Sequence, residues 1–196
     1  GNAATVGALS NNTIAAASFS SGMATTTTPQ YTFTSAATLP TTIKLRATDT
    51  DNISSSGNIE GTTAIRSGRI KLNNASGSES LALPVPMAAQ YYNGTAFITN
   101  AADNCTIVPI PATPTASTGL LTSLTTTATL SSPFSAGDGK LKLSKPNAKG
   151  YVDITIAAPA WLQYNWKGTG LTNPTARATF GVYKNANEFI YMREMY

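Results

Sequence analysis

The stretch Arg66-Ser-Gly-Arg-Ile-Lys-Leu-Asn-Asn-Ala-Ser-Gly-Ser-Glu79 decides the fold class of this chain. Within it, Ile70 and Leu72 alternate with Arg69 and Lys71. A period of two is typical of a strand that turns one face to a core and the other to water. The stretch therefore predicts a β-strand followed by a turn.

The next stretch, Leu83-Pro-Val-Pro-Met-Ala-Ala-Gln-Tyr-Tyr-Asn-Gly94, continues the pattern. Its aliphatic residues share one face and its two prolines share the other. Proline cannot donate to a ladder, so we expect this strand to lie at a sheet edge or to leave the sheet there. Asn93-Gly94, flanked by aromatic residues, predicts a hairpin with a type I′ turn.

The same alternation occurs at Ile43 and Leu45, and at Leu141 and Leu143. No segment shows an apolar period of 3.6 residues over three turns. The sequence therefore predicts an all-β fold, an antiparallel β-sandwich of Ig-like or jelly-roll-like type with little or no helix. Further strands are expected at residues 13–20, 31–35, 120–130, 151–156, 161–166, 179–184 and 188–193, the last two forming a hairpin.

Composition supports a single β-domain over residues 1–196. Charged residues make up only 11% of the 196 residues, whereas helical bundles are rich in Glu and Lys. Residues 1–40 carry little charge but offer apolar anchors, and we expect them to pair with a sheet or with a neighbouring subunit. The net charge of +4 is mild, and no nucleic-acid-binding motif is present.

The residues available for catalysis are few. The chain has no histidine, which excludes Ser-His-Asp and Cys-His arrangements and His-ligated zinc. Asp49 and Asp51 form a close carboxylate pair that suits either a turn, a calcium contact or a catalytic dyad. We favour the turn, and we expect no enzyme activity, no cofactor and no metal.

Two surfaces are candidates for binding. Trp161, Tyr164 and Trp166 could stack on a glycan or contact a partner; alternatively, one tryptophan belongs to the core and the other is exposed, because an odd spacing places them on opposite faces of a strand. The second candidate is a basic face, which forms only if the strands that carry it are neighbours; otherwise its cations serve solubility. Its residues are Lys44, Arg46, Arg69, Lys71, Lys140 and Lys142.

Cys105 is the one cysteine, so no intramolecular disulfide can form. We interpret it as a small buried apolar residue. No stretch approaches the roughly 20 apolar residues of a membrane span.

Ordered blocks over residues 42–196 carry a family resemblance. Glu60-Gly-Thr-Thr-Ala-Ile-Arg-Ser-Gly-Arg-Ile-Lys-Leu72, the Leu-Pro-Val-Pro block, Trp161-Leu-Gln-Tyr164 and Ala176-Arg-Ala-Thr-Phe-Gly-Val-Tyr183 resemble the C-terminal domain of MshQ-like proteins. These are large bacterial surface proteins named for biogenesis of the mannose-sensitive haemagglutinin pilus. The resemblance implies an extracellular, bacterial cell-surface location.

The chain departs from that family pattern in two places. Where relatives carry an aspartate-rich loop similar to a calcium site, this chain has Asn165, Lys167, Thr169 and Asn173. Losing the carboxylates should abolish calcium affinity. The further cysteines of relatives, which could pair with Cys105, are also missing.

These observations predict a non-enzymatic structural or adhesive module of a pilus-like or filamentous surface assembly. Its expected partners are copies of itself or other surface proteins, engaged by β-strand addition. A carbohydrate-binding adhesin domain is the alternative.

Overall fold

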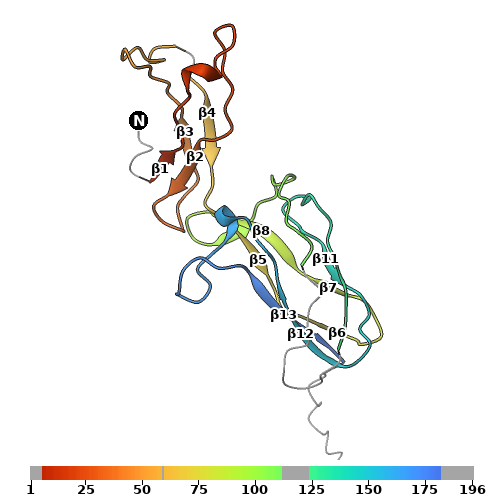
Figure 1. The fold of residues 1–196 in the computed structure, drawn as a ribbon. Helices are drawn as coiled ribbons and strands as arrows, with labels where there is room; N and C mark the ends of the chain where they lie inside the picture. Colours follow the sequence, from red (N-terminus) through yellow and green to blue (C-terminus); the bar gives the residue numbers. More distant parts are fainter. Residues whose placement is uncertain (1–5, 59, 112–123, 182–196) are drawn as a thin grey trace, which may run out of the picture. The chain divides into compact units, whose positions relative to one another are not determined.

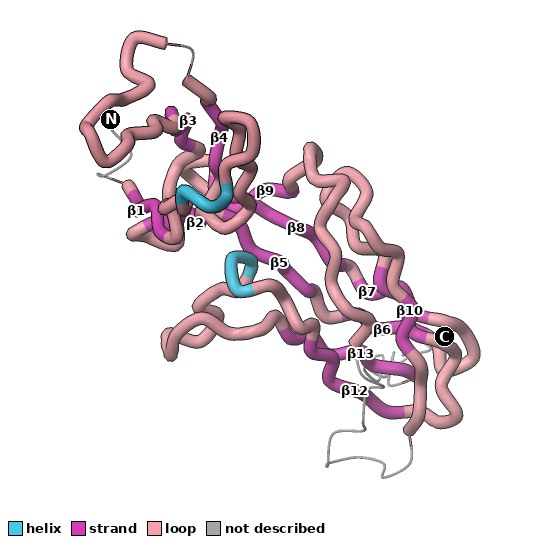
Figure 2. Tube along the Cα trace, turned by 45° about the horizontal axis from the view of Figure 1, so that its top comes forward, coloured by secondary structure: helices cyan, strands magenta, loops and turns pink. Residues whose placement is uncertain are grey.

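The computed structural model describes residues 6–58, 60–111 and 124–181. The strands of the described chain are short and are joined by long loops, and its only helices are the single 3-10 turns η2 (Ala16–Ser18) and η3 (Ala160–Leu162) (Figures 1 and 2). The all-β prediction is confirmed. The strand predicted at 13–20 is wrong, because η2 lies there, and the hairpin predicted near 188–193 lies outside the described residues.

The chain divides into two compact units. Unit 1 comprises Gly1–Gly68 and Gln90–Ile98, and unit 2 comprises Arg69–Ala89 and Thr99–Tyr196. That residues 1–196 form a single domain stays a prediction.

Unit 1 contains two antiparallel two-stranded sheets. β1 (Gly7–Ser10) pairs with β2 (Gln30–Phe33), and β3 (Thr41–Lys44) pairs with β4 (Thr62–Ile65). The strand expected from the alternation around Ile43 is therefore confirmed. Its apolar face is shorter than expected, since Ile43 is buried but Leu45 lies beyond the strand and is 47% exposed.

Unit 2 holds two three-stranded sheets. One has the order β10 (Ala128–Thr129), β11 (Leu141–Leu143), β7 (Leu83–Val85); the other has the order β12 (Gly150–Thr155), β13 (Thr175–Phe180), β6 (Ala75–Gly77). The pairings are antiparallel except β13 with β6, which is parallel. As the prolines predicted, β7 is an edge strand.

A third sheet has the order β5 (Gly68–Leu72), β8 (Met87–Tyr92), β9 (Phe97–Thr99), and each of these strands has residues in both units. β8 and β9 form the predicted hairpin. Its loop, however, spans residues 93–96 and closes with a bond from the Asn93 N–H to the Ala96 carbonyl (3.0 Å). Gly94 alone of the Asn-Gly pair has a positive φ, so the type I′ prediction is wrong.

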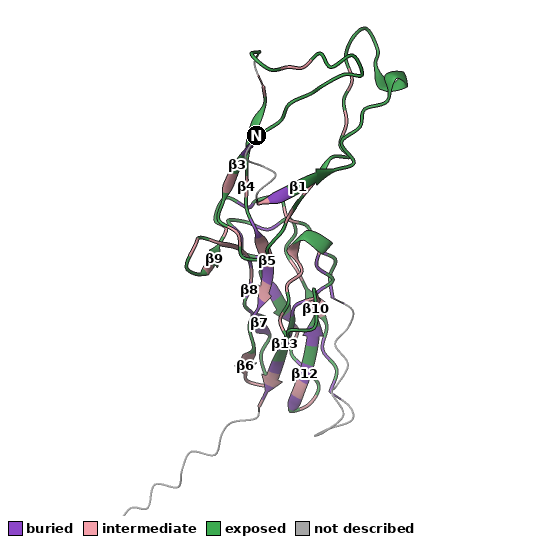
Figure 3. Ribbon diagram, turned by 90° about the vertical axis from the view of Figure 1, so that its left-hand side faces the viewer, coloured by how far each residue is buried: buried purple, intermediate pink, exposed green. Residues whose placement is uncertain are grey.

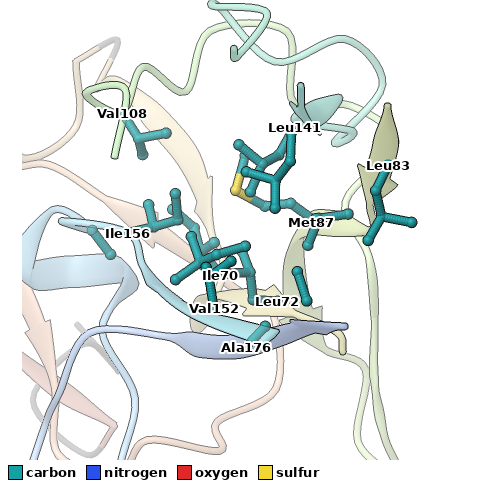
Figure 4. Packing of buried hydrophobic residues seen from close by; sticks show 14 of the residues in the cluster. Ile70, Leu72, Leu83, Met87, Val108, Leu141, Val152, Ile156 and Ala176 are labelled. Carbon is teal, nitrogen blue, oxygen red and sulfur yellow. The ribbon is translucent and has the colours of Figure 1, made fainter. Parts of the chain in front are cut away.

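One hydrophobic core lies within unit 2. The aliphatic side chains of β5, β7, β11 and β12 alternate between core and solvent as the sequence predicted, and they point toward one another in Figure 4. Phe134 and Phe180 add the largest fully buried side chains. Because each large side chain in such a core contributes several kcal/mol, this cluster is the main source of stability in unit 2.

Candidate interaction surfaces

Unit 1 has very little core of its own. Among its described residues Ile43 is the only buried large hydrophobic side chain, and every member of the main core cluster belongs to unit 2. Large apolar side chains of unit 1 are exposed instead, and Figure 3 shows the long loops of this unit mostly in the exposed colour. They are Leu9, Ile14, Phe19, Met23, Leu39, Leu45, Ile53 and Ile98.

The strand edges in unit 1 carry almost no charge. β1, β2 and β4 have the sequences GALS, QYTF and TTAI, without a charged residue or a proline. Proteins commonly protect exposed edges with Lys, Pro or bulges, because an uncharged edge is a template for another strand. β4 is the plainest case, since Thr62, Thr63 and Ala64 are all exposed.

The ladder register identifies which backbone groups of β4 point away from β3. The Leu45 N–H donates to the Gly61 carbonyl (2.8 Å), and the register pairs Ile43 with Thr63 and Thr42 with Ala64. Directly opposite residues of an antiparallel ladder alternate between hydrogen-bonded and non-hydrogen-bonded pairs. Ala64 therefore directs its N–H and C=O away from β3, toward the outer edge of the strand.

Cations predicted for a basic face surround one carboxylate in unit 1. The Glu60 side chain is 0% exposed and accepts from Lys44 Nζ (2.9 Å) and Arg46 Nε (2.7 Å). Ser55 Oγ also donates to it (3.0 Å). Hydrogen bonds from Arg46 and Lys44 lower the pKa of the Glu60 carboxyl from 4.5 to about 2. Lys44 and Arg46 are thus held in a local ion cluster.

The remaining basic-face residues lie on strands of different sheets. Arg69 and Lys71 are on β5, which pairs with β8, whereas Lys142 is on β11, which pairs with β7 and β10. Lys140 precedes β11 and has a φ of 44°. Strand pairing therefore does not bring these cations together, and no described sheet assembles the basic face.

Asp49 serves the turn that the sequence favoured. Its Oδ1 accepts the backbone N–H groups of Asp51 (3.0 Å) and Ile53 (2.8 Å). This is the local hydrogen bonding by which aspartate stabilises turns. In the described part of the chain, cysteine and carboxylate side chains nowhere gather in threes that could hold a metal ion.

The aromatic residues of unit 2 adopt a geometry that the sequence did not predict. Residues 161–166 form no strand: Trp161 lies in η3, and a loop follows. Arg69 Cζ lies 4.7 Å from the Tyr164 ring centre and 4.8 Å from that of Trp166, and the two rings meet edge to face at 5.1 Å. Burial lowers the pKa of Arg69, but arginine remains cationic.

Backbone and amide contacts hold the same loop in place. Tyr164 and Thr172 exchange two backbone hydrogen bonds (3.3 and 3.0 Å). Asn173 Oδ1 accepts from the Ala158 N–H (3.1 Å) and from Gln163 Nε2 (3.2 Å). The loop is thus fixed at both ends, next to a cation–π cluster at Arg69.

The turn η3, directly before this loop, presents one aromatic ring to solvent. Trp161 is 77% exposed, while Trp166 is half-buried and its buried Nε1 has no hydrogen-bond acceptor among the described residues. Tyr164 and Trp166 are already stacked on Arg69, so of the three predicted contact residues Trp161 is the one whose ring is available. The odd spacing of the two tryptophans led to the alternative prediction that one is exposed and the other packed. The structure has this arrangement, although residues 161–166 do not form the strand on which the prediction was based.

Three further loop residues differ in their roles. Asn165 Oδ1 accepts the Gly170 N–H (3.2 Å), so this position supports the loop, while Lys167 and Thr169 are exposed. Cys105 is exposed, which makes the prediction of a buried cysteine wrong. Its backbone N–H donates to the buried Asp103 carboxylate (3.1 Å).

One cross-strand contact was not predicted from the sequence. Arg177 on β13 lies opposite Asp153 on β12, with Nε 2.7 Å from Oδ1 and Cζ 4.0 Å from the Tyr151 ring centre. Both side chains lie on the exposed faces of their strands, and their opposite charges could have suggested pairing once the register was known.

Comparison with known proteins gives one family. Residues 66–195 match the family described as DUF6701, fourth domain. No curated protein and no solved structure matches the chain. Within residues 6–58, 60–111 and 124–181, no helix has the length and apolar composition needed to cross a bilayer. Because the family match spans well over half of its residues, the chain belongs to the DUF6701 fourth-domain family.

Proposed function

We propose that this chain is a non-enzymatic, extracellular structural module of a bacterial surface assembly, and that it associates with copies of itself by β-strand addition. The observation that carries the proposal is the outer edge of β4, an uncharged strand whose Ala64 N–H and C=O point away from its only partner among the described residues. A strand from a second copy would satisfy these groups.

The small core of unit 1 supports the same proposal. Isolated two-stranded sheets are at best marginally stable in water, and β1–β2 and β3–β4 are both of this kind within the described residues. Adding a neighbour's strand would extend these sheets and cover exposed apolar side chains such as Phe19 and Met23. Association would thus supply the burial that unit 1 does not supply itself.

The surface location and the pilus-like character rest on the resemblance to MshQ-like proteins. Protease treatment of intact cells tests the location. Loss of the full-length band from intact cells supports an extracellular module, and protection until lysis contradicts it.

A proline substitution tests strand addition. Ala64→Pro removes the outward N–H without removing a hydrogen bond to β3, and proline is tolerated on strand edges in this orientation. Ala64→Val is the matched control, since it keeps the N–H and favours a strand. We expect Ala64→Pro to weaken self-association roughly tenfold in sedimentation velocity, while Ala64→Val associates like the parent.

Two results would refute the assembly mechanism. One is a parent chain that stays monomeric across the concentration series. The other is equal association of the parent and Ala64→Pro. Circular dichroism of each variant separates lost association from lost folding.

A specific observation favours the second candidate, a carbohydrate-binding adhesin domain: Trp161 is 77% exposed in η3, next to an anchored loop, and exposed aromatic rings can stack on sugars. Glycan-array binding that disappears in Trp161→Ala but persists in Leu171→Ala supports it. Absence of binding by the parent removes it.

A further inference from the structure

Five asparagines begin the acceptor motif for N-linked glycosylation, Asn-x-Ser/Thr with x other than proline. All five lie in the described residues, so their geometries can be compared. They are Asn11, Asn52, Asn74, Asn93 and Asn104.

Two of these asparagines use their side chains to join distant parts of the chain. Asn74 Oδ1 accepts the Arg177 N–H, and Asn104 Oδ1 accepts the Ala136 N–H, both at 2.8 Å. In the Asn104 motif the hydroxyl of Thr106 is also occupied, since it donates to the Asp103 carboxylate at 2.6 Å. Both side chains thus anchor a distant backbone segment, and the Thr106 hydroxyl is bound to Asp103 and not to the amide of its own motif.

Two others sit at left-handed backbone positions, with φ of 51° at Asn11 and 65° at Asn52. In the Asn52 motif, Ser54 Oγ accepts the Ser56 N–H (3.3 Å), which directs this hydroxyl along its own turn. Neither motif shows a hydrogen bond between the asparagine amide and its serine or threonine hydroxyl.

Asn93 combines the required features. Its Oδ1 accepts from the Thr95 hydroxyl (3.0 Å) and the Thr95 N–H (3.0 Å), so the amide and the hydroxyl of one motif are already side by side. Both residues are exposed, in the loop between β8 and β9. The bonds hold Oδ1, while Nδ2 takes part in no hydrogen bond among the described residues.

The loop around Asn93 is also well supported. The Ala96 N–H makes a third bond to Asn93 Oδ1 (2.9 Å), and the Tyr92 hydroxyl donates to the Gly94 carbonyl (2.7 Å). At Gly94, with φ of 109°, a Cβ would lie 2.7 Å from Leu39 Cδ2. Glycine at the middle motif position therefore belongs to the turn that exposes the amide.

We propose that Asn93 is an N-glycosylation site that accepts a sugar from a diphosphate-activated donor. Nδ2 attacks the anomeric carbon, an N–C bond forms, and the bond from that carbon to the diphosphate oxygen breaks. The electron pair leaves with the diphosphate, and a base of the transferase takes the amide proton. In the cell, modification of Asn93 rests on the proposed export of the chain. The attached hydrophilic glycan would cover the β8–β9 hairpin.

The test uses the purified folded chain, UDP-glucose and a soluble N-glucosyltransferase that requires only the three-residue motif, with peptide mass mapping of every motif. We expect hexose at Asn93 in the parent and in Thr95→Ser, which keeps the hydroxyl. We expect none at this position in Thr95→Ala or Asn93→Gln. Circular dichroism verifies that each variant is folded.

Asn93 left unmodified in the folded parent while another motif is labelled would overturn the proposal. Labelling of Asn93 only after thermal unfolding would also overturn it, because the folded turn would then hinder the reaction. Sedimentation of the same samples reports on self-association separately, so failure at Asn93 and failure of the strand-addition proposal are distinguishable.

Discussion

Arg69 on β5 lies under the ring of Tyr164, with Cζ 4.7 Å from the ring centre, and this contact ties a loop distant in sequence to the edge of the unit 2 core. Arg69 follows the alternation of its strand, since Ile70 beside it is fully buried. The side chain on the outward face is therefore covered by aromatic rings and is not simply solvated.

We predict that Arg69→Met loosens the aromatic loop. Methionine keeps much of the packing but removes the charge, so the expected loss is the cation–π contribution, about 0.5–2 kcal/mol of unfolding free energy. Amide hydrogen exchange at Tyr164, Trp166 and Thr172 should speed up. Lys71→Met on the same strand is the control, and equal exchange in both variants would count against the cluster as the anchor.

The two tryptophans should respond differently to truncation. Trp161→Ala removes a ring that is 77% exposed and should change the unfolding free energy by less than about 0.5 kcal/mol. Trp166→Ala removes contacts with Arg69 and Tyr164 and should cost more than about 1 kcal/mol. Urea denaturation followed by circular dichroism compares them, and a larger loss for Trp161→Ala would contradict the assignment.

Gly139 is predicted to be a packing position. A Cβ there would lie 2.8 Å from Cζ of Phe134, a side chain that is 1% exposed, and would also meet Met87. Gly139→Ala should therefore overpack the core and cost about 1–3 kcal/mol, seen as a lower urea midpoint. Gly61→Ala is the control, because within the described residues no atom beyond its two chain neighbours lies within 4 Å of the added Cβ. A Gly139→Ala midpoint at or above the parent's would show that this region of the core repacks freely.

The alternation of apolar and charged residues correctly predicted the short core strands in which every second side chain is buried. Ile70 with Leu72, and Leu141 with Leu143, are buried as their two-residue spacing indicated. Leu45 has the same spacing from Ile43, yet it is exposed because β3 ends at Lys44. Periodicity locates a strand, but the partner that the strand finds decides where it stops.

The candidate surfaces could be predicted only in part. The aromatic run at 161–166 has strand composition, but its preceding Pro159 starts a 3-10 turn and the loop packs on Arg69. That contact joins residues far apart in sequence, so no local pattern encodes it. The uncharged run Thr62-Thr63-Ala64-Ile65 could have indicated an unprotected strand edge from the sequence. Only the register, however, shows which backbone amides of β4 face outward.

The Glu60 cluster predicts a pH dependence in unit 1. The folded carboxyl has a pKa of about 2, below the value of 4.5 for an unpaired glutamate. A lowered folded-state pKa means that the ionised group stabilises the fold above the unfolded pKa, and that this contribution is lost as the pH falls from about 4.5 toward 2. Unit 1 should therefore open more readily over that interval.

Glu60→Gln separates this effect from other acid-sensitive groups such as Asp103, whose burial tends to raise its pKa but whose hydrogen bonds from Thr106 and Cys105 lower it overall. Glutamine can accept hydrogen bonds from Lys44 and Arg46 but carries no charge. At pH 7 the variant should exchange the amide protons of β3 and β4 faster than the parent, and the difference should close as the pH approaches 2, because the parent's carboxyl is then protonated too. A difference that is constant from pH 7 to about 2 would mean that the charge of Glu60 contributes nothing and that the shape of its side chain alone holds the cluster.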